Sequence, residues 1–242
     1  MADYTTNRSN ERFVFRRVSW STWEELGDYS QFTGGSLEFG AYTALKTSAQ
    51  LAYTGDAPDA TDPIRVYYQF TDDSGELSEL HALGTYFAGI SEVTWSPGGD
   101  GLIQTGTITG SSMLKALQDR LCGLPLTVPA GTDPIAYAVD LITAAGLRAN
   151  VQRVGASTLA NPHTFEASDS WLTIVNWCLT NATPAYQAAT VDGYGVIQVQ
   201  PYQDPTSRAA VWTFRDDESS IMQPTVAEAN EWMTAANVVR LY

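Results

Sequence analysis

The fold of this chain is decided by the run IRVYYQF at residues 64–70 and by the acidic turn DDSG at residues 72–75 that follows it. The run is dominated by β-branched and aromatic residues, which favour strands because they pack well on a pleated surface. Asp, Ser and Gly favour tight turns. A strand, a turn and a second strand form the simplest structure for this stretch.

The segments on either side of this run are also predicted to be strands. Apolar and polar positions alternate in residues 36–39, which is typical of a half-buried strand. Residues 83–93 and 102–109 flank the Pro- and Gly-rich residues 96–101, and we predict a hairpin with a wide loop there. Further predicted strands are residues 12–20 and 47–53, and residues 55–63 are a predicted loop. The first 110 residues therefore predict an all-β unit, a barrel or a sandwich.

The hydrophobic period changes after residue 110. Apolar positions on one helical face predict a short helix at residues 113–121, capped by Ser111 and Ser112. A second helix is predicted at residues 134–145, because Asp133 precedes a proline that suits the first turn and Gly146 can end the helix. A third helix is predicted at residues 171–179.

A second hairpin is predicted near the end of this region, where residues 186–191 and 196–201 flank Asp192-Gly193. The chain as a whole therefore predicts an α+β fold that is mainly β. We divide it into a β-rich domain at residues 1–110, a helix-containing insertion at residues 111–165 and an α+β domain at residues 166–242.

Charge and targeting signals limit the possible functions. The formal net charge of −14 argues against sequence-independent DNA binding, which requires Lys and Arg to displace counterions from phosphate. Cys122 and Cys178 lie far apart in apolar contexts and are predicted to be free, buried thiols. We predict no signal peptide and no membrane-spanning segment, so the protein is expected to fold in a cytoplasm.

No constellation of residues predicts catalysis, a cofactor or a metal site. His81 and His163 are the only histidines, too few for a His-rich zinc site or a repeated triad. The segment Gly193-Tyr194-Gly195 lies between strands and is interpreted as a hairpin turn, not a phosphate loop. A pair of carboxylates could catalyse glycoside hydrolysis. Solvated turns are the favoured interpretation of the acidic clusters formed by Asp72, Asp73, Asp216, Asp217 and Glu218.

A calcium site is a further alternative for the acidic loop of Asp56, Asp59 and Asp62. The loop lacks the alternating ligand spacing and the closing glutamate of an EF-hand. The sequence therefore favours an ordinary solvated loop here.

Several short motifs follow one another along the chain in a fixed order. They are TGGS at 33–36, LGTYF at 83–87, the helix at 113–121, VPAGT at 128–132, the leucine-containing helix at 171–179, DGYG at 192–195 and QPY at 200–202. From about Trp23 to Tyr242, this order resembles the hub-type minor tail proteins of long-tailed phages that infect Gram-positive, especially actinobacterial, hosts. Two features differ: residues 235–239 lack the proline of an aromatic-Pro-Asn turn, and relatives continue past the position of Tyr242.

The resemblance implies a baseplate-hub-like fold of tube-like β-barrel domains with small helical insertions, the last domain being an incomplete second tube-like domain. It implies a homotrimer at the tail tip of the virion, assembled in the host cytoplasm. The implied partners are the tail tube or distal tail protein, the end of the tape-measure protein and the receptor-binding tip proteins. DNA would pass through the channel without specific binding.

Two other functions remain open. A carbohydrate-binding or adhesion module of the tail tip would use exposed aromatic residues, for which the candidates are Tyr53, Trp95, Tyr186 and Tyr202. An enzyme such as a cell-wall hydrolase is the third hypothesis. For the hub, we expect part of the acidic residues in the ranges 56–62, 72–79 and 216–218 to line the channel and repel DNA.

Overall fold

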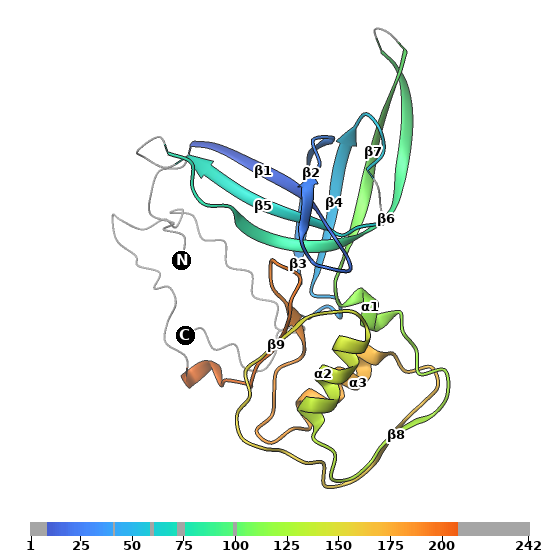
Figure 1. Cartoon of the computed structure of the whole chain (residues 1–242), viewed down its shortest axis with the longest axis vertical. Coiled ribbons are helices and arrows are strands. Elements are labelled where there is room, and N and C mark those ends of the chain that lie inside the picture. The colour runs from blue at the N-terminus through green and yellow to red at the C-terminus, as the bar shows by residue number, and fades with distance from the viewer. Residues whose placement is uncertain (1–8, 41, 59–60, 72–75, 99–100, 208–242) are drawn as a thin grey trace, which may run out of the picture. The chain divides into compact units, whose positions relative to one another are not determined.

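The computed structural model describes residues 9–207 apart from residues 41, 59–60, 72–75 and 99–100 (Figure 1). The described residues up to Pro201 belong to one compact unit, and a second unit begins at Tyr202. The described part of the second unit contains one short 3-10 helix, η1, at Pro205–Ser207. No helix among the described residues is both long enough and apolar enough to cross a membrane.

The first unit contains a seven-stranded antiparallel sheet with the order β2-β1-β5-β6-β7-β4-β3. The described strands do not close it into a barrel, and β2 and β3 lie at its edges. The strands are β1 (Ser9–Val18), β2 (Glu25–Asp28), β3 (Phe32–Phe39), β4 (Thr47–Thr54), β5 (Ile64–Thr71), β6 (His81–Gly98) and β7 (Gly101–Ser112). The prediction of an α+β, mainly β fold is confirmed.

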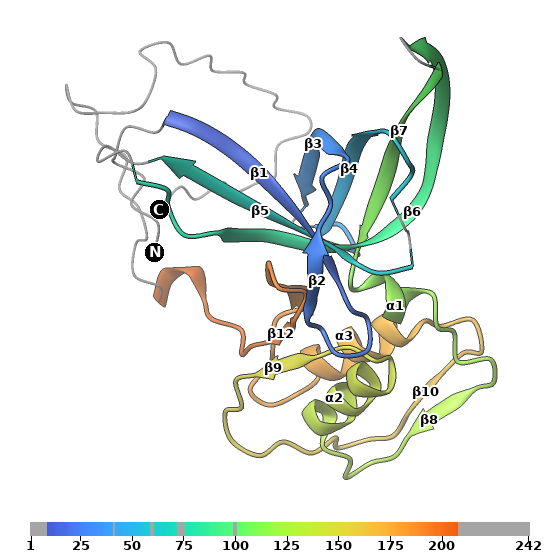
Figure 2. The ribbon, with the colours of Figure 1, turned by 45° about the horizontal axis from the view of Figure 1, so that its top comes forward.

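The sheet bends along β6, which takes part in both halves of it (Figures 1 and 2). The beginning of β6 pairs with β5, and from Tyr86 onwards β6 pairs with β7. The bend brings β1 and β3 together although they are far apart in the strand order, since the rings of Phe15 and Phe32 lie 5.0 Å apart. Buried side chains from β1, β3, β4, β5, β6 and β7 form the sheet core between the two halves.

The helical layer of this unit contains α1 (Lys115–Gln118), α2 (Pro134–Ala144) and α3 (Trp171–Thr180). The Asp133 side chain caps α2 by accepting hydrogen bonds from the N–H groups of Ile135 and Ala136, at 3.0 and 3.1 Å. Ser170 caps α3 by accepting from the N–H of Thr173 at 3.2 Å. These caps satisfy N–H groups that have no partner within the helix. The helices at 134–145 and 171–179 were therefore predicted correctly, to within one residue at each end.

Two small sheets accompany the helices. One pairs β8 (Leu126–Val128) with β10 (His163–Phe165). The other has the order β11-β12-β9 and contains β9 (Ala149–Val151), β11 (Thr190–Val191) and β12 (Ile197–Val199), with β9 and β12 parallel. A second buried cluster, distinct from the sheet core, packs these elements together. The hairpin around Asp192-Gly193 is confirmed, with shorter strands than predicted.

Two local predictions were wrong. The helix predicted at 113–121 is one turn long, because Leu121 and Cys122 pair in extended form with Ser170 and Asp169. The wide loop at 96–101 is absent, because β6 and β7 pair as far as Gly98 and Gly101. The TGGS motif occupies the second to fifth residues of β3, next to a shift in its register with β4. The three domain boundaries stay predictions.

Candidate interaction surfaces

The DGYG turn between β11 and β12 is closed by its own aspartate. Asp192 Oδ1 accepts hydrogen bonds from the N–H groups of Tyr194 and Val196, both at 2.9 Å. Gly195 adopts a φ of 77°, a left-handed conformation that glycine tolerates best. The residue types of the motif thus fix the shape of the turn.

The same turn docks on the seven-stranded sheet. The carbonyl of Gly193 accepts a hydrogen bond from the Thr85 hydroxyl of β6 at 2.9 Å. A Cβ atom on Gly193 would lie 2.1 Å from the carbonyl oxygen of Ala82, so only glycine fits without a shift of the backbone. The carbonyl of Tyr194 accepts from Arg65 and Arg148, both at 3.1 Å. The DGYG motif therefore joins the helical layer to the sheet.

The buried Arg65 is the centre of a polar cluster at this contact. Its guanidinium donates to Glu25 Oε1 at 3.0 Å and to the Thr85 hydroxyl at 3.0 Å. Glu25 also accepts hydrogen bonds from Arg16 and from the Tyr67 hydroxyl. Burial alone would raise the pKa of Glu25, but the hydrogen bonds from Tyr67, Arg16 and Arg65 together lower it. The carboxylate is thus held in its charged form.

Arg148 adds a second cation beside Arg65. Its guanidinium lies 4.6 Å from the centre of the Trp23 ring, a favourable cation–π arrangement. Burial and repulsion from Arg65 lower the pKa of Arg148. Glu25 binds Arg16, Arg65 and Tyr67, and both Arg65 and Arg148 bind the Tyr194 carbonyl, which indicates a structural contact between the two layers.

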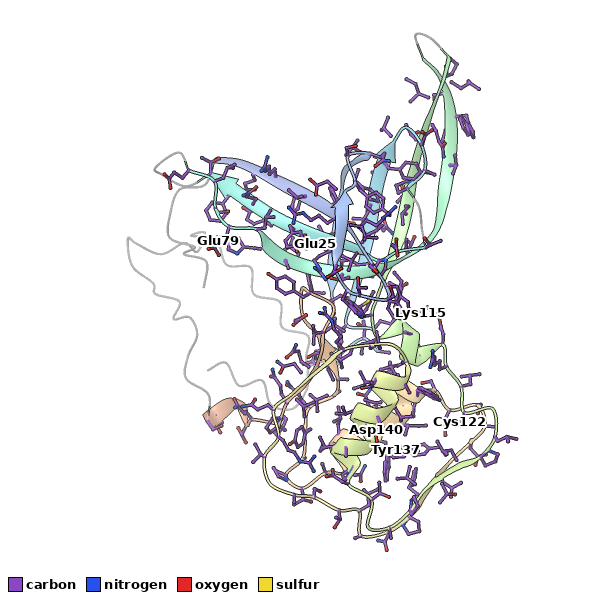
Figure 3. All side chains as sticks on the ribbon, viewed as in Figure 1. Glu25, Glu79, Lys115, Cys122, Tyr137 and Asp140 are labelled. Atoms are coloured by element: carbon purple, nitrogen blue, oxygen red, sulfur yellow. The ribbon has the colours of Figure 1, made fainter. Side chains whose placement is uncertain are left out.

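The histidines pack against aromatic rings. His81 is stacked on Phe70, with ring centres 6.0 Å apart, and His163 is stacked on Trp177 at 4.4 Å. Neither histidine takes part in a group of three metal-binding side chains, and the described part of the chain contains no such group. Figure 3 shows that Glu25 lies with the seven-stranded sheet, whereas Cys122 and Asp140 lie with the helices.

The acidic loop and clusters can be followed only in part. Asp62 forms an ion pair with Arg17 at 3.4 Å, and Asp56 is exposed. Asp59, Asp72 and Asp73 lie outside the described residues, as do Asp216, Asp217 and Glu218. The expectation that these clusters line a channel stays a prediction.

The cysteines are free, as predicted. Cys178 is fully buried in the helical layer, and burial raises its pKa to about 12. The prediction that Cys122 is buried was wrong, because it is only half-buried; partial burial and the charge of Asp169 raise its pKa.

Two of the four candidate aromatic residues for carbohydrate binding were wrong. Tyr53 and Tyr186 are buried, Tyr53 in the sheet core and Tyr186 in the helical layer, so neither presents a ring face to a ligand. The Tyr186 hydroxyl accepts a hydrogen bond from the N–H of Val154 at 3.0 Å. Trp95 and Tyr202 are exposed.

A cleft of about 470 Å³ lies beside α1, with Trp20 and Phe87 on its wall. Its charged side chains have partners within the chain. Lys115 pairs with Asp119, and Arg120 donates to the carbonyl of Ala144 at 2.8 Å. The cleft thus offers aromatic surface with a polar rim whose charges are already satisfied.

Two apolar surfaces lie on the seven-stranded sheet, and of their exposed residues only Trp95 was named as a candidate from the sequence. The first is the end of the β6–β7 hairpin, where Val93, Trp95, Leu102 and Ile103 are exposed. The second is a groove of about 190 Å³ whose lining includes exposed Phe13 and Phe39. Hydrophobic patches of this kind often mark interaction sites.

The chain shares its fold with part of a tail protein from Neisseria meningitidis MC58, at a TM-score of 0.50 and 12% identity over 79% of this chain and 50% of that protein. A 43 kDa tail protein of prophage MuSo2 from Shewanella oneidensis matches with a TM-score of 0.46 and 12% identity, over 79% of this chain and 54% of that protein. A prophage tail protein from Listeria monocytogenes EGD-e matches with a TM-score of 0.44 and 10% identity, over 85% of this chain and 56% of that protein.

The chain thus spans about half the length of the tail proteins that it matches. No protein-family model and no curated protein matches the sequence.

Proposed function

We propose that this chain is a structural protein of a phage tail and that it forms the hub at the distal tip of the tail tube. The observation that carries the proposal is the fold shared with part of the Neisseria tail protein. The ordered motifs between Trp23 and Tyr242 support the hub type and a Gram-positive, actinobacterial host.

In this proposal, three copies form a ring in the virion after assembly in the host cytoplasm. The ring joins the tail tube or distal tail protein to the receptor-binding tip proteins, and it anchors the end of the tape-measure protein. DNA passes through without specific binding, which agrees with the net charge of −14. Part of the carboxylates in residues 56–62, 72–79 and 216–218 would face the channel.

The proposed domains are a tube-like domain at residues 1–110, a helix-containing insertion at 111–165 and an incomplete second tube-like domain at 166–242. The role proposed for the contact around Arg65 and the DGYG turn is to hold the helical layer on the sheet while load passes through the tail. The hydrogen bonds around the buried Arg65 support this role, because satisfied polar networks make a contact more rigid.

The second candidate is an adhesion or carbohydrate-binding module of the tail tip. It is favoured by the exposed ring of Trp95. Saturable binding to isolated cell-wall polysaccharide, lost on Trp95→Ala and retained in Leu124→Ala, would support it. If the protein released fragments from cell walls, this would instead support an enzyme and contradict both the hub and the binding module.

The hub proposal is tested by locating the chain in the particle. Purified virions are labelled with gold-conjugated antibodies raised against this chain and viewed by negative-stain electron microscopy. Label confined to the distal tip supports the proposal, with antibodies to the major tube protein as the control for labelling along the tail. Virions without label, or with label along the whole tube, would contradict it.

A further inference from the structure

The free end of the β6–β7 hairpin is an arm that extends past its neighbouring strand. The last residue of β4 to pair with β7 is Thr54, opposite Thr105. Residues 95–98 and 101–104, which we call the arm, pair only with each other among the described strands. Figures 1 and 2 show the arm projecting from the sheet. A two-stranded ribbon is only marginally stable alone in water, so the arm is a candidate for contact with a partner.

One face of the arm is apolar. The register places Trp95 opposite Gln104 and Pro97 opposite Leu102. Side chains directly opposite each other share a face, so these residues and Val93 form one surface. The exposed fractions of Val93, Trp95 and Leu102 are 42%, 59% and 68%. The end of the arm therefore presents an indole ring flanked by aliphatic side chains.

This apolar face continues the side of the sheet that covers its core. Alternation along β7 places Gln104 on the same face as Ile108, which is buried in the sheet core. The amide of Gln104 donates to the hydroxyl of the buried Tyr53 at 3.3 Å, consistent with this placement. Trp95 thus extends the core-facing surface to a point where no opposing strand of the described chain covers it.

The groove is an opening into the same sheet core. Its floor includes Phe15, Leu51 and Val66, and the exposed rings of Phe13 and Phe39 stand at its rim. The volume of about 190 Å³ exceeds the ~150 Å³ cavity that holds benzene in another protein. A single large aromatic side chain is therefore an occupant of suitable size.

The groove and the arm of one copy cannot meet. Leu51 in the groove pairs with Ile108, four residues along β7 from Gln104. At about 3.4 Å per residue, this places the Trp95 row roughly 14 Å from the Leu51 row. Phe39 at the rim is opposite Thr47, farther still from the arm. Because the ladder holds the arm in line with the strands, Trp95 does not reach the groove of its own copy.

A second copy of the chain can make this contact without bringing like charges together. Two copies with a net charge of −14 repel each other wherever their carboxylates approach. The residues that line the groove and those of the described arm carry no charge. Contact between these two surfaces therefore buries apolar area without placing like charges together.

We propose that Trp95 of one copy inserts into the groove of a second copy. The contact is heterologous, because it joins two different surfaces and leaves one arm and one groove free at the ends of a pair. The inference adds a specific contact between copies to the proposed function. It rests on that function for the closure of the copies into a ring. Trp95 is the expected centre of the binding energy, as tryptophans seated in pockets often are.

The full chain is tested by sedimentation velocity over a range of concentrations. Wild type is expected to associate reversibly, and Trp95→Ala to weaken association by about 30-fold. Leu124→Ala is the matched control, because Leu124 is also exposed and apolar but lies outside the arm and the groove, and it should associate like wild type. Circular dichroism checks that each variant is folded.

A mixing experiment tests the heterologous geometry. Phe39→Glu places a carboxylate at the groove rim and keeps the arm intact, whereas Trp95→Ala keeps the groove intact. At a concentration at which wild type is associated but a contact weakened about 30-fold is not, each variant alone should be mainly monomeric. Their mixture should form a one-to-one dimer and no larger species, because one working arm and one working groove remain between them.

Three results would overturn the inference. The first is association of Trp95→Ala at wild-type strength. If antibodies still labelled the tail tip in that case, the hub proposal would stand and only this contact would be refuted. The second is a strictly monomeric wild type at every concentration. The third is a monomer that binds phosphatidylcholine vesicles through Trp95, which would assign the arm to a membrane.

Discussion

Replacing Arg65 by methionine should destabilise the protein through the contact between the sheet and the helical layer. The substitution keeps a long apolar side chain but removes a buried guanidinium. It deletes the bonds to Glu25 Oε1, to the Thr85 hydroxyl and to the Tyr194 carbonyl, at 3.0, 3.0 and 3.1 Å. Breaking a buried charged pair costs about 3–5 kcal/mol.

The low end of that range applies here. Glu25 keeps its bonds to Arg16 and Tyr67, and it retains some contact with solvent. We therefore expect a loss of about 3 kcal/mol in the free energy of unfolding. In a chain of this size, each kcal/mol lowers Tm by about 2–4 °C, so Tm should fall by roughly 6–12 °C.

The assay is thermal unfolding followed by circular dichroism, with Arg17→Met as the control. Arg17 pairs with Asp62 at 3.4 Å, but its side chain is 40% exposed. Exposed ion pairs contribute about 0–1 kcal/mol, so the control should lose at most a few degrees. A loss for Arg65→Met no greater than for Arg17→Met would refute the reasoning.

Three further outcomes are expected. Gly193→Ala should lower the free energy of unfolding by about 1–3 kcal/mol in urea titrations, because its Cβ would meet the Ala82 carbonyl; an unchanged midpoint would show that the turn is not docked. The folded-state pKa of Glu25 is lowered from 4.5, so its carboxylate stabilises the fold above that pH and the contribution is lost as pH falls through the folded-state pKa. The difference in unfolding free energy between wild type and Glu25→Gln should thus be full near neutral pH and shrink in acid, whereas a constant difference would contradict it. Cys178, with a pKa of about 12, should resist a thiol reagent at about pH 8 until the protein unfolds, and rapid native labelling would disprove its burial.

The sequence predicted those elements whose signals are local. Residues 64–70 have the composition of a strand that is buried on both faces, and β5 begins at Ile64 as expected. Asp133 and Ser170 mark the starts of α2 and α3 because their side chains accept bonds from N–H groups of the first helical turn. The turn at Asp192-Gly193 was also recognisable from its residue types.

Contacts between distant segments could not be predicted in this way. Arg65 bonds to the carbonyl of Tyr194, 129 residues away, and no local pattern encodes that pairing. Tyr53 has the residue type of an exposed binding aromatic, but the fold of the sheet buries it in the core. The apolar residues after position 112 suggested a longer helix, whereas Met113 and Leu114 fill the core of the helical layer. Tertiary packing decided each of these cases.

Cryo-electron microscopy of the tail tip in intact virions tests the central claim most directly. The account predicts that this chain forms a closed threefold ring with an axial channel at the distal end of the tube. Contrary results would be a tip without density for this chain, or isolated copies bound to the outside of the tube.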